Sequence, residues 1–284
     1  MTMGKQIPTN TLVEGGGRPL PEGKMQRLVV NVPTHDMIPY SFAFDFANMI
    51  GYTVAMLGNE LDIVTNVVPG TYIHKARQQL IDGALEMGCN WMLWLDSDMR
   101  FPKDALVRLM MHNEDIVGVN YSTRQIPPRY VAIKETAMED PNGKGWLCPT
   151  RAESTGLEEV GAVGFGLVLM KAAFLNNMPS RDKGMWFWFE QDIERGSHIG
   201  EDVYFCREAR RAGAKVYVDH DLSKEIAHTG QMEYRLEHVL EFEHLQANMI
   251  PDYYEYHGIE REDEDGADNV QRVADGDSEL VESE

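Results

Sequence analysis

The sequence is poor in cysteine and has no long apolar run. The cysteines lie far apart and form neither a Cys-x-x-Cys pair nor a Cys/His ligand spacing; they are Cys89, Cys148 and Cys206. This pattern predicts neither a disulfide framework nor a zinc site. No stretch approaches the ~20 apolar residues that cross a bilayer, and residues 1–23 do not resemble a signal peptide. We therefore expect no membrane span and a cytoplasmic location, which is the host cytoplasm if the protein is viral.

Basic residues are also scarce. The chain holds 26 Lys and Arg against 46 Asp and Glu, a formal net charge of −20 at pH 7. Residues 260–284 alone hold 11 acidic and 2 basic side chains, a net charge of −9, which predicts a disordered acidic tail over residues 259–284. The remaining charge of −11 argues against a large footprint on nucleic acid.

The most informative segment is an apolar run, Trp91–Leu95, that stops at two carboxylates, Asp96 and Asp98. Side chains two apart on an extended backbone point the same way, so both carboxylates can reach one cation. Hard oxygen ligands suit Mg²⁺ or Mn²⁺, and these ions keep open positions that diphosphate oxygens can fill. The alternative is a polar strand end followed by a turn.

The first part of the chain alternates predicted strands with predicted helices. Apolar runs predict the strands, and apolar positions at helical spacing predict the helices. The strands cover residues 28–32, 62–68, 91–95 and 115–121, and the helices cover 41–57, 72–87 and 103–112. This order implies right-handed crossovers and a largely parallel sheet, with the aspartate pair at the edge where such sheets bind ligands.

Beyond residue 122 the pattern is that of α+β proteins. A glycine-punctuated segment, 160–170, runs into an apolar strand, and Gly200-Glu201-Asp202 opens a helix over 203–212. A strand over 215–218 and a helix over 233–250 follow. The aromatic run Trp186–Phe189 either stacks on a sugar or base or alternates within a buried strand, and a buried strand is the commoner structure.

Taken in order, these segments resemble the GT-A fold glycosyltransferases. They share a strand ending in Asp-Ser-Asp, a Gly-rich segment, Gly-Glu-Asp at a helix start, the strand Gly-Ala-Lys-Val-Tyr-Val and a late His. The resemblance runs from Leu28 to Gly230 and is to family 2 type enzymes and to fungal Golgi α-mannosyltransferases. It implies an α/β, Rossmann-like single domain with a mixed, mostly parallel central sheet. The implied divisions are a flexible segment 1–26, a glycosyltransferase domain 27–232 with nucleotide-binding half 27–122 and acceptor half 123–232, a helical extension 233–258 and the tail 259–284.

The resemblance implies a metal site. In such enzymes the Asp-x-Asp motif holds the Mn²⁺ or Mg²⁺ that bridges the two phosphates of a nucleotide-sugar. Asp98 is then a metal ligand, and Asp96 faces either the ribose or the metal. His228 matches a histidine that often completes the metal shell, although a histidine without this context is more often a satisfied core or surface residue.

The resemblance also implies donor-binding residues. Pro33 and Thr34 match the loop that lines the nucleotide base. Asn66 stands at the end of the second predicted strand, where relatives often have an acidic residue. Arg77 matches an arginine near the base and the diphosphate, and a solvated helix residue is the alternative. His74, one turn earlier on the same helix, can serve the same purpose.

Glu201 and Asp202 match the Glu-Asp pair that supplies the catalytic base in inverting members. We expect Asp202 to deprotonate the acceptor hydroxyl and Glu201 to position the acceptor. If the retaining mannosyltransferases are the nearer relatives, Asp202 orients the acceptor instead. The alternative is an acidic pair that favours the helix dipole at an N-terminus.

The predicted function is that of a metal-dependent hexosyl- or pentosyltransferase. It would move a sugar from a UDP- or GDP-sugar to a hydroxyl of a glycan, a protein or a phage-type modified DNA base. The acidic body argues against DNA, although a local basic patch that includes Arg124, Arg129 and Lys134 could offset this. The alternatives are an inactive GT-A-shaped binding protein, which would lack turnover, and a nucleotidyltransferase, which would transfer the nucleotide.

Overall fold

The computed structural model describes residues 20, 22–35, 37–70, 72–135, 147–180, 184–192, 197–230 and 233–242. The predicted acidic tail, most of the predicted N-terminal segment and residues 243–258 of the predicted extension lie outside these ranges. The described residues contain no helix with the length and apolar character that crossing a bilayer requires.

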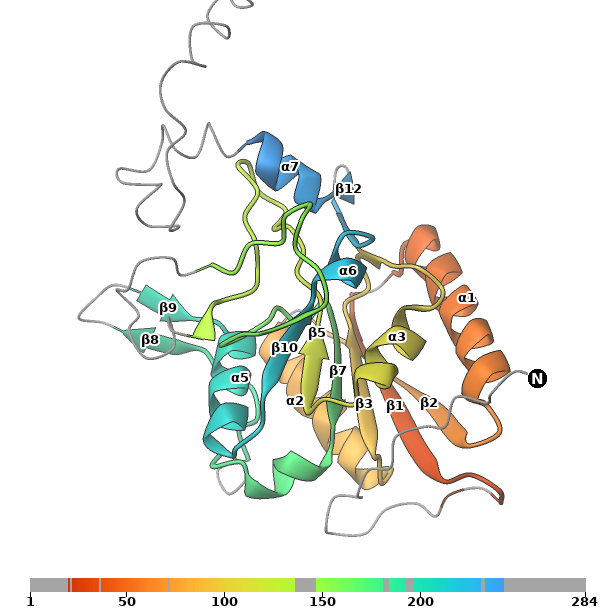
Figure 1. The fold of residues 1–284 in the computed structure, drawn as a ribbon. Helices are drawn as coiled ribbons and strands as arrows, with labels where there is room; N and C mark the ends of the chain where they lie inside the picture. Colours follow the sequence, from red (N-terminus) through yellow and green to blue (C-terminus); the bar gives the residue numbers. More distant parts are fainter. Residues whose placement is uncertain are drawn as a thin grey trace, which may run out of the picture.

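A seven-stranded sheet forms the centre of the molecule (Figure 1). Its strands are β1 (Gln26–Thr34), β2 (Leu61–Pro69), β3 (Trp91–Leu95), β5 (Ile116–Gly118), β6 (Leu157–Glu159), β7 (Leu167–Lys171) and β10 (Val216–Asp219). Their spatial order is β2-β1-β3-β7-β5-β10-β6. Strands β2, β1, β3, β5 and β10 run the same way, whereas β7 and β6 run antiparallel to their neighbours. The prediction of an α/β fold with a mixed, mostly parallel sheet is confirmed.

Helices cover both faces of the sheet (Figure 1). One face packs against α1 (Tyr40–Leu57), α3 (Ala105–His112) and α6 (His220–Ser223), and the other against α2 (Ile73–Glu86), η1 (Ala173–Asn177) and α5 (Glu201–Arg211). Strand β3 contributes side chains to the hydrophobic cores on both faces of the sheet. Trp91, Leu93 and Leu95 point to the α1 and α3 face, and Met92 and Trp94 point to the α2 and α5 face. All five side chains are fully buried, and burial of each contributes roughly 1.5–3 kcal/mol.

A small second sheet extends the carboxyl edge of β3. Its strands are β4 (Met99–Arg100), β11 (Ala227–Thr229) and β12 (Glu233–Tyr234), in the order β12-β11-β4. His228 pairs with Met99, and the Thr229 N–H donates to the Asp98 carbonyl oxygen at 2.7 Å. This pairing brings a residue from the end of the domain beside the aspartates of β3. The remaining described elements are the hairpin β8 (Glu190–Asp192) and β9 (Ser197–Ile199), and α7 (Leu236–Glu241).

The elements of the first half lie close to their predicted positions, but two predictions in the second half are wrong. The run at 186–189 is not a strand: Trp186 and Phe187 are buried, whereas Trp188 and Phe189 are exposed. The glycine-punctuated segment does run into an apolar strand, as predicted: β7 begins at Leu167, and Tyr121 lies beside the preceding Gly164 and Gly166.

The second wrong prediction is the start of the helix at 233. Residues 233–234 form β12, which pairs with β11, so the boundary predicted after residue 232 falls inside the small sheet. A helix begins only at Leu236, after an extended Arg235 whose backbone N–H donates to the His238 ring. Local helical periodicity therefore gave way to strand pairing.

Candidate functional site

A pocket of about 260 Å³ opens at the carboxyl ends of β1 and β3. Its volume is close to the lower limit for small-molecule sites, roughly 300 Å³. Parallel strands end here with their helices leading away, which is where open α/β sheets bind ligands. The residues that line it are Pro33, Thr34, His35, Gly70, Ile73, Asp96, Ser97, Asp98, Arg124 and His228.

Asp98 and His228 face each other in this pocket. His228 Nε2 lies 3.5 Å from Asp98 Oδ2, and its Nδ1 lies 3.0 Å from the Ser122 carbonyl oxygen. A carbonyl oxygen only accepts, so Nδ1 carries a proton, and in the neutral ring Nε2 presents its lone pair toward the carboxylate. Asp98 Oδ1 is buried and has no hydrogen-bond partner among the described residues. Two lone-pair donors that converge in this way can hold a divalent cation.

Arg124 brings a partly exposed guanidinium into the pocket. Its Nη1 lies 2.8 Å from Asp98 Oδ2, and its side chain is 46% exposed. The sequence analysis assigned Arg124 to a basic patch that could contact DNA. The structure instead pairs it with a carboxylate, so its charge is partly neutralised inside the pocket.

Arg77 organises the carboxylates from behind the pocket. Its Nη2 donates to both oxygens of Asp96 at 3.0 Å, and its Nη1 donates to Glu201 Oε1 at 2.5 Å. The Arg77 side chain is only 4% exposed and does not line the pocket. It therefore joins α2, the end of β3 and the start of α5. Arg77 is thus too deeply buried to make the contact with a donor in this pocket that the sequence predicted. Glu201, which was expected to position the acceptor, is also buried and does not line the pocket.

Asp202 stands on the first turn of α5 beside this buried group. Its Oδ1 accepts the Val203 N–H at 2.8 Å, which satisfies one free amide of the helix start. Asp202 is half-buried and does not line the pocket. Its charge nevertheless acts on Arg77 and on the Tyr121 hydroxyl. Glu201 and Asp202 thus occupy the first turn of α5, where the helix-dipole alternative places them, and Asp202 also lies near the charged group around Arg77.

Burial and charge separate the two aspartates of the motif. Burial raises the pKa of Asp96 above its ordinary value, and the Arg77 charge only partly offsets this. Burial also acts on Asp98, but the neighbouring His228 and the charge of Arg124 outweigh it, so the pKa of Asp98 is lowered. Asp98 is thus the carboxylate held ionised toward the pocket, as a metal ligand must be.

The carboxylates on α5 behave like Asp96. Burial is the main cause that raises the pKa of Glu201 and of Asp202, and the Arg77 charge opposes it in both. In Arg77, burial lowers the pKa, yet the surrounding carboxylates outweigh burial and the pKa is raised. A raised carboxyl pKa is typical of groups that exchange a proton during a reaction.

The structure brings most of the predicted residues together. Pro33 and Thr34 line the pocket with Asp96, Asp98 and His228. Asn66 does not. It lies inside β2 rather than at its end, and its Nδ2 donates to Asn31 Oδ1 and to the Leu80 carbonyl. Asn66 therefore ties the sheet to α2.

Sequence reasoning missed Tyr121 and the pocket role of Arg124. The Tyr121 ring packs edge-on against His228 with centroids 5.3 Å apart, and its hydroxyl accepts the Gly166 N–H at 3.1 Å. A Cβ on Gly166 would lie 2.8 Å from the Tyr121 ring. Tyr121 and Arg124 both follow β5, whose carboxyl end lies at the same sheet edge as that of β3. Their place in the chain after a predicted strand was the sequence signal that could have indicated a role in the pocket.

Comparisons with known proteins come from structure alone. No protein-family model and no curated protein sequence matches the chain. The chain is similar to the solved structure of "A197 from STIV". The two share 18% identity over 72% of this chain and 86% of that chain, with a TM-score of 0.43.

A second similar structure is "GalNAc-T7 with UDP, GalNAc and Mn2+". Here the identity is 8% and the TM-score 0.38, and the match covers 72% of this chain and 43% of that chain. Because both TM-scores are below 0.5, neither likeness carries an argument about function.

Proposed function

We propose that the protein is a metal-dependent glycosyltransferase that moves a sugar from a UDP- or GDP-sugar to a hydroxyl acceptor. The observation that carries the proposal is the pair of Asp98 and His228 at the carboxyl end of β3. The Ser122 carbonyl fixes the proton of His228 on the far nitrogen, and Asp98 Oδ1 is buried without a partner among the described residues. These two groups present lone pairs to one point in a pocket at a ligand-binding sheet edge.

The donor set fits Mn²⁺ or Mg²⁺. Asp98 is the anionic ligand and His228 the neutral one, and an imidazole favours Mn²⁺ of the two ions. Asp96 is turned to Arg77 and serves as a nearby anchor for the ribose or the metal. When bound, the ion neutralises the charge that grows on the departing diphosphate.

The donor diphosphate takes the place of Asp98 as the partner of Arg124. The Arg124 side chain is more exposed than those of Asp98 and His228, so it can turn to a phosphate oxygen without unpacking the core. A guanidinium binds phosphate through two parallel hydrogen bonds. Thr34, whose Oγ1 is buried without a partner among the described residues, lines the same pocket and supplies a further polar contact.

Asp202 acts as the general base. It takes the proton of the acceptor hydroxyl while that oxygen bonds to the anomeric carbon and the bond from this carbon to the diphosphate oxygen breaks. Its raised pKa supports this role because it brings the carboxylate closer to the basicity of a proton acceptor at neutral pH. Arg77 and Glu201 hold the first turn of α5, and with it Asp202, against the end of β3.

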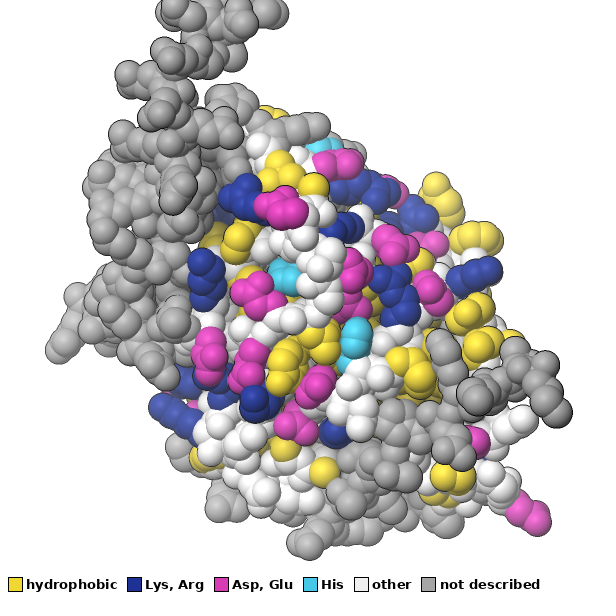
Figure 2. Space-filling model, viewed as in Figure 1, with side chains coloured by type: hydrophobic (Ala, Val, Ile, Leu, Met, Phe, Trp, Pro, Cys, Tyr) yellow, Lys and Arg dark blue, Asp and Glu magenta, His cyan; other side chains and the backbone are white. Residues whose placement is uncertain are grey.

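The acceptor side of the site is aromatic. Tyr72, Trp188 and Phe189 are exposed around His74, with the Phe189 and His74 rings 5.2 Å apart. Such faces stack on sugars and bases. The described surface drawn in Figure 2 intersperses Lys and Arg with Asp and Glu and shows no broad basic area. This face and the net charge of −20 together favour a glycan or protein hydroxyl over one on DNA.

The test is release of nucleoside diphosphate from a panel of UDP- and GDP-sugars with and without Mn²⁺ or Mg²⁺. We expect metal-dependent release that falls by at least about 100-fold in Asp98→Ala and in Asp202→Asn. Asp104→Ala, which removes a carboxylate outside the pocket, is the matched control and keeps wild-type activity. Release that ignores metal and survives Asp98→Ala would refute the proposal. Transfer of the nucleotide itself would identify a nucleotidyltransferase, and absence of turnover with tight donor binding would identify a binding protein.

A further inference from the structure

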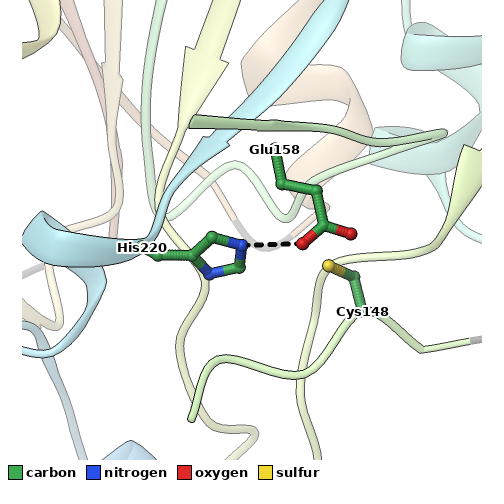
Figure 3. Close-up of side chains that lie close together, drawn as sticks. All are labelled: Cys148, Glu158 and His220. Atoms are coloured by element: carbon green, nitrogen blue, oxygen red, sulfur yellow. Dashed lines mark hydrogen bonds and ion pairs between the residues drawn. The ribbon is translucent and has the colours of Figure 1, made fainter. Parts of the chain in front are cut away.

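A second group of ligating side chains lies apart from the pocket. Cys148, Glu158 and His220 place one sulfur, one carboxylate oxygen and one ring nitrogen within 4.8 Å of one another. Among the described residues this is the one group of three such side chains that meets so closely. Figure 3 shows the three side chains pointing toward a common centre from three separate segments. None of them lines the pocket at β3.

We infer that Cys148, Glu158 and His220 form a zinc-binding site. The separations suit tetrahedral coordination, because zinc bonds of about 2.0–2.3 Å place neighbouring ligand atoms about 3.3–3.8 Å apart. His220 Nε2 and Glu158 Oε2 are 3.0 Å apart, so a small opening of this pair admits the ion. A set of one sulfur, one nitrogen and one oxygen ligand selects zinc over the harder Mn²⁺ and Mg²⁺.

The surroundings orient the histidine for this role. His220 Nδ1 lies 2.8 Å from Thr150 Oγ1. Without metal the Thr150 hydroxyl donates to Nδ1, and the Nε2–H donates to Glu158. With metal the ring proton is on Nδ1, the hydroxyl oxygen accepts it, and Nε2 binds the ion. The rotatable hydroxyl supports both states, as a partner behind a metal-bound histidine must.

Asn120 fixes this support. Its side-chain oxygen accepts two backbone N–H groups, from Val131 and Ala132, so its amide orientation is determined. Its nitrogen then donates to Thr150 Oγ1 at 3.1 Å and to the Cys148 carbonyl at 2.7 Å. The buried Asn120 amide therefore positions both the backbone at Cys148 and the Thr150 hydroxyl that contacts His220.

Charge and access also suit zinc. Cys148 and His220 are buried, whereas the Glu158 side chain is 50% exposed and gives the ion a way in. Binding releases the thiol proton to solvent and leaves one thiolate and one carboxylate on Zn²⁺. The site is then neutral, which a buried position favours.

The ion would fasten the edge of the main sheet. Glu158 is on β6, the edge strand of the main sheet, which pairs antiparallel with β10. His220 begins α6 directly after β10. Cys148 comes from the loop region behind them. A bond network through one ion would therefore hold β6, α6 and this loop together, and α6 leads on to β11 and His228.

The test uses the full-length protein, stripped with a chelator and titrated with Co²⁺ as a spectroscopic probe for zinc. We expect a thiolate-to-cobalt charge-transfer absorption that saturates at one ion per chain and disappears when Zn²⁺ is added. Cys148→Ser removes this absorption. Glu158→Gln weakens Co²⁺ binding by at least about tenfold. Glu159→Gln, the same change on the neighbouring residue of β6, is the matched control and binds Co²⁺ like wild type.

A second readout is the melting temperature. Zn²⁺ raises it in wild type and in Asp98→Ala, which removes the proposed metal ligand of the other site, and raises it less in Glu158→Gln. If Cys148→Ser fails to fold, the half-exposed Glu158→Gln compared with Glu159→Gln decides the question alone. Wild-type protein without the thiolate absorption, or equal Co²⁺ binding by these two glutamate variants, would overturn the zinc site and leave a metal-free network of hydrogen bonds.

Discussion

At the scale of single residues, Arg77 holds the candidate site together from inside the protein. It neutralises Asp96 and Glu201, which come from different elements and are both largely buried. Without Arg77, the buried Glu201 carboxylate would have neither water nor this partner, and Asp96, whose side chain is 24% exposed, would have only partial contact with water. The guanidinium is thus needed for the fold of the site, although it does not line the pocket.

We expect Arg77→Met to lower the free energy of unfolding by about 3–5 kcal/mol, because it leaves two buried carboxylates unpaired. Arg108→Met is the control, since the pair of Arg108 with Glu225 is partly exposed and contributes about 1 kcal/mol or less. Urea unfolding of both variants at neutral pH measures the difference. Equal losses would show that the Arg77 group does not stabilise the site.

Asp202 gives a prediction about pH. Burial raises its pKa, and the base must be unprotonated, so we expect kcat to fall as pH decreases through a pKa above the ordinary value of 3.8. Asp202→Asn lacks this limb of the profile. A pH-rate series with each protein measures it, and an unchanged acidic limb in the variant would assign the limb to another group.

The same shift has a consequence for stability. A carboxyl whose pKa is raised on folding binds its proton more tightly when folded, so its ionised form destabilises the protein above the folded pKa. This penalty shrinks as pH falls through the folded pKa and is gone below the unfolded value. We therefore expect Asp202→Asn to melt at neutral pH at the same or a higher temperature than wild type. A lower melting temperature would show that the charged form is net stabilising.

At the scale of elements, the pocket depends on how closely the segment before β7 approaches Tyr121. A Cβ on Gly166 would lie 2.8 Å from the Tyr121 ring and 2.9 Å from the Met99 sulfur. Tyr121 packs against His228, and Met99 pairs with it across β4 and β11. Space at this glycine therefore controls the position of a candidate metal ligand.

Two glycine substitutions are expected to change stability in opposite directions. Gly166→Ala should destabilise by about 1–3 kcal/mol, because the added methyl group overpacks the Tyr121 contact. Gly51→Ala should stabilise by about 0.5–1 kcal/mol, because Gly51 lies in the interior of α1 with nothing within 4 Å of an added Cβ. Chemical denaturation of the two variants measures both changes. A Gly166→Ala protein as stable as wild type would mean that the ring moves freely.

At the scale of the whole molecule, charge is concentrated at the end of the chain. Residues 260–284 carry −9 of the net −20 and lie outside the described residues. The described pocket and both cores are built from residues before them. Deletion of 260–284 is therefore expected to leave the melting temperature and the rate of diphosphate release unchanged. A large fall in either quantity, measured on full-length and truncated protein side by side, would assign the tail a role in the fold or the site.

Local patterns predicted much of the fold. Strand β3 covers the predicted residues, and the other elements of the first half differ from prediction at their ends. These segments have strong apolar periodicity and are buried on defined faces, so local preference and tertiary packing agree. The aromatic run at 186–189 and the residues at 233–234 failed because long-range packing and strand pairing determined their conformations.

The sequence by itself determined that a buried strand ends in two aspartates at the ligand edge of an α/β sheet, because that inference needs only residue spacing and chain order. The tertiary structure decided which side chains meet there. It turned Asp96 and Glu201 inward to Arg77 and set Arg124 and His228 against Asp98. It also gathered Cys148, Glu158 and His220, although their spacing in the sequence predicts no zinc site. Contacts between residues so far apart follow from strand pairing and packing, which no local pattern encodes.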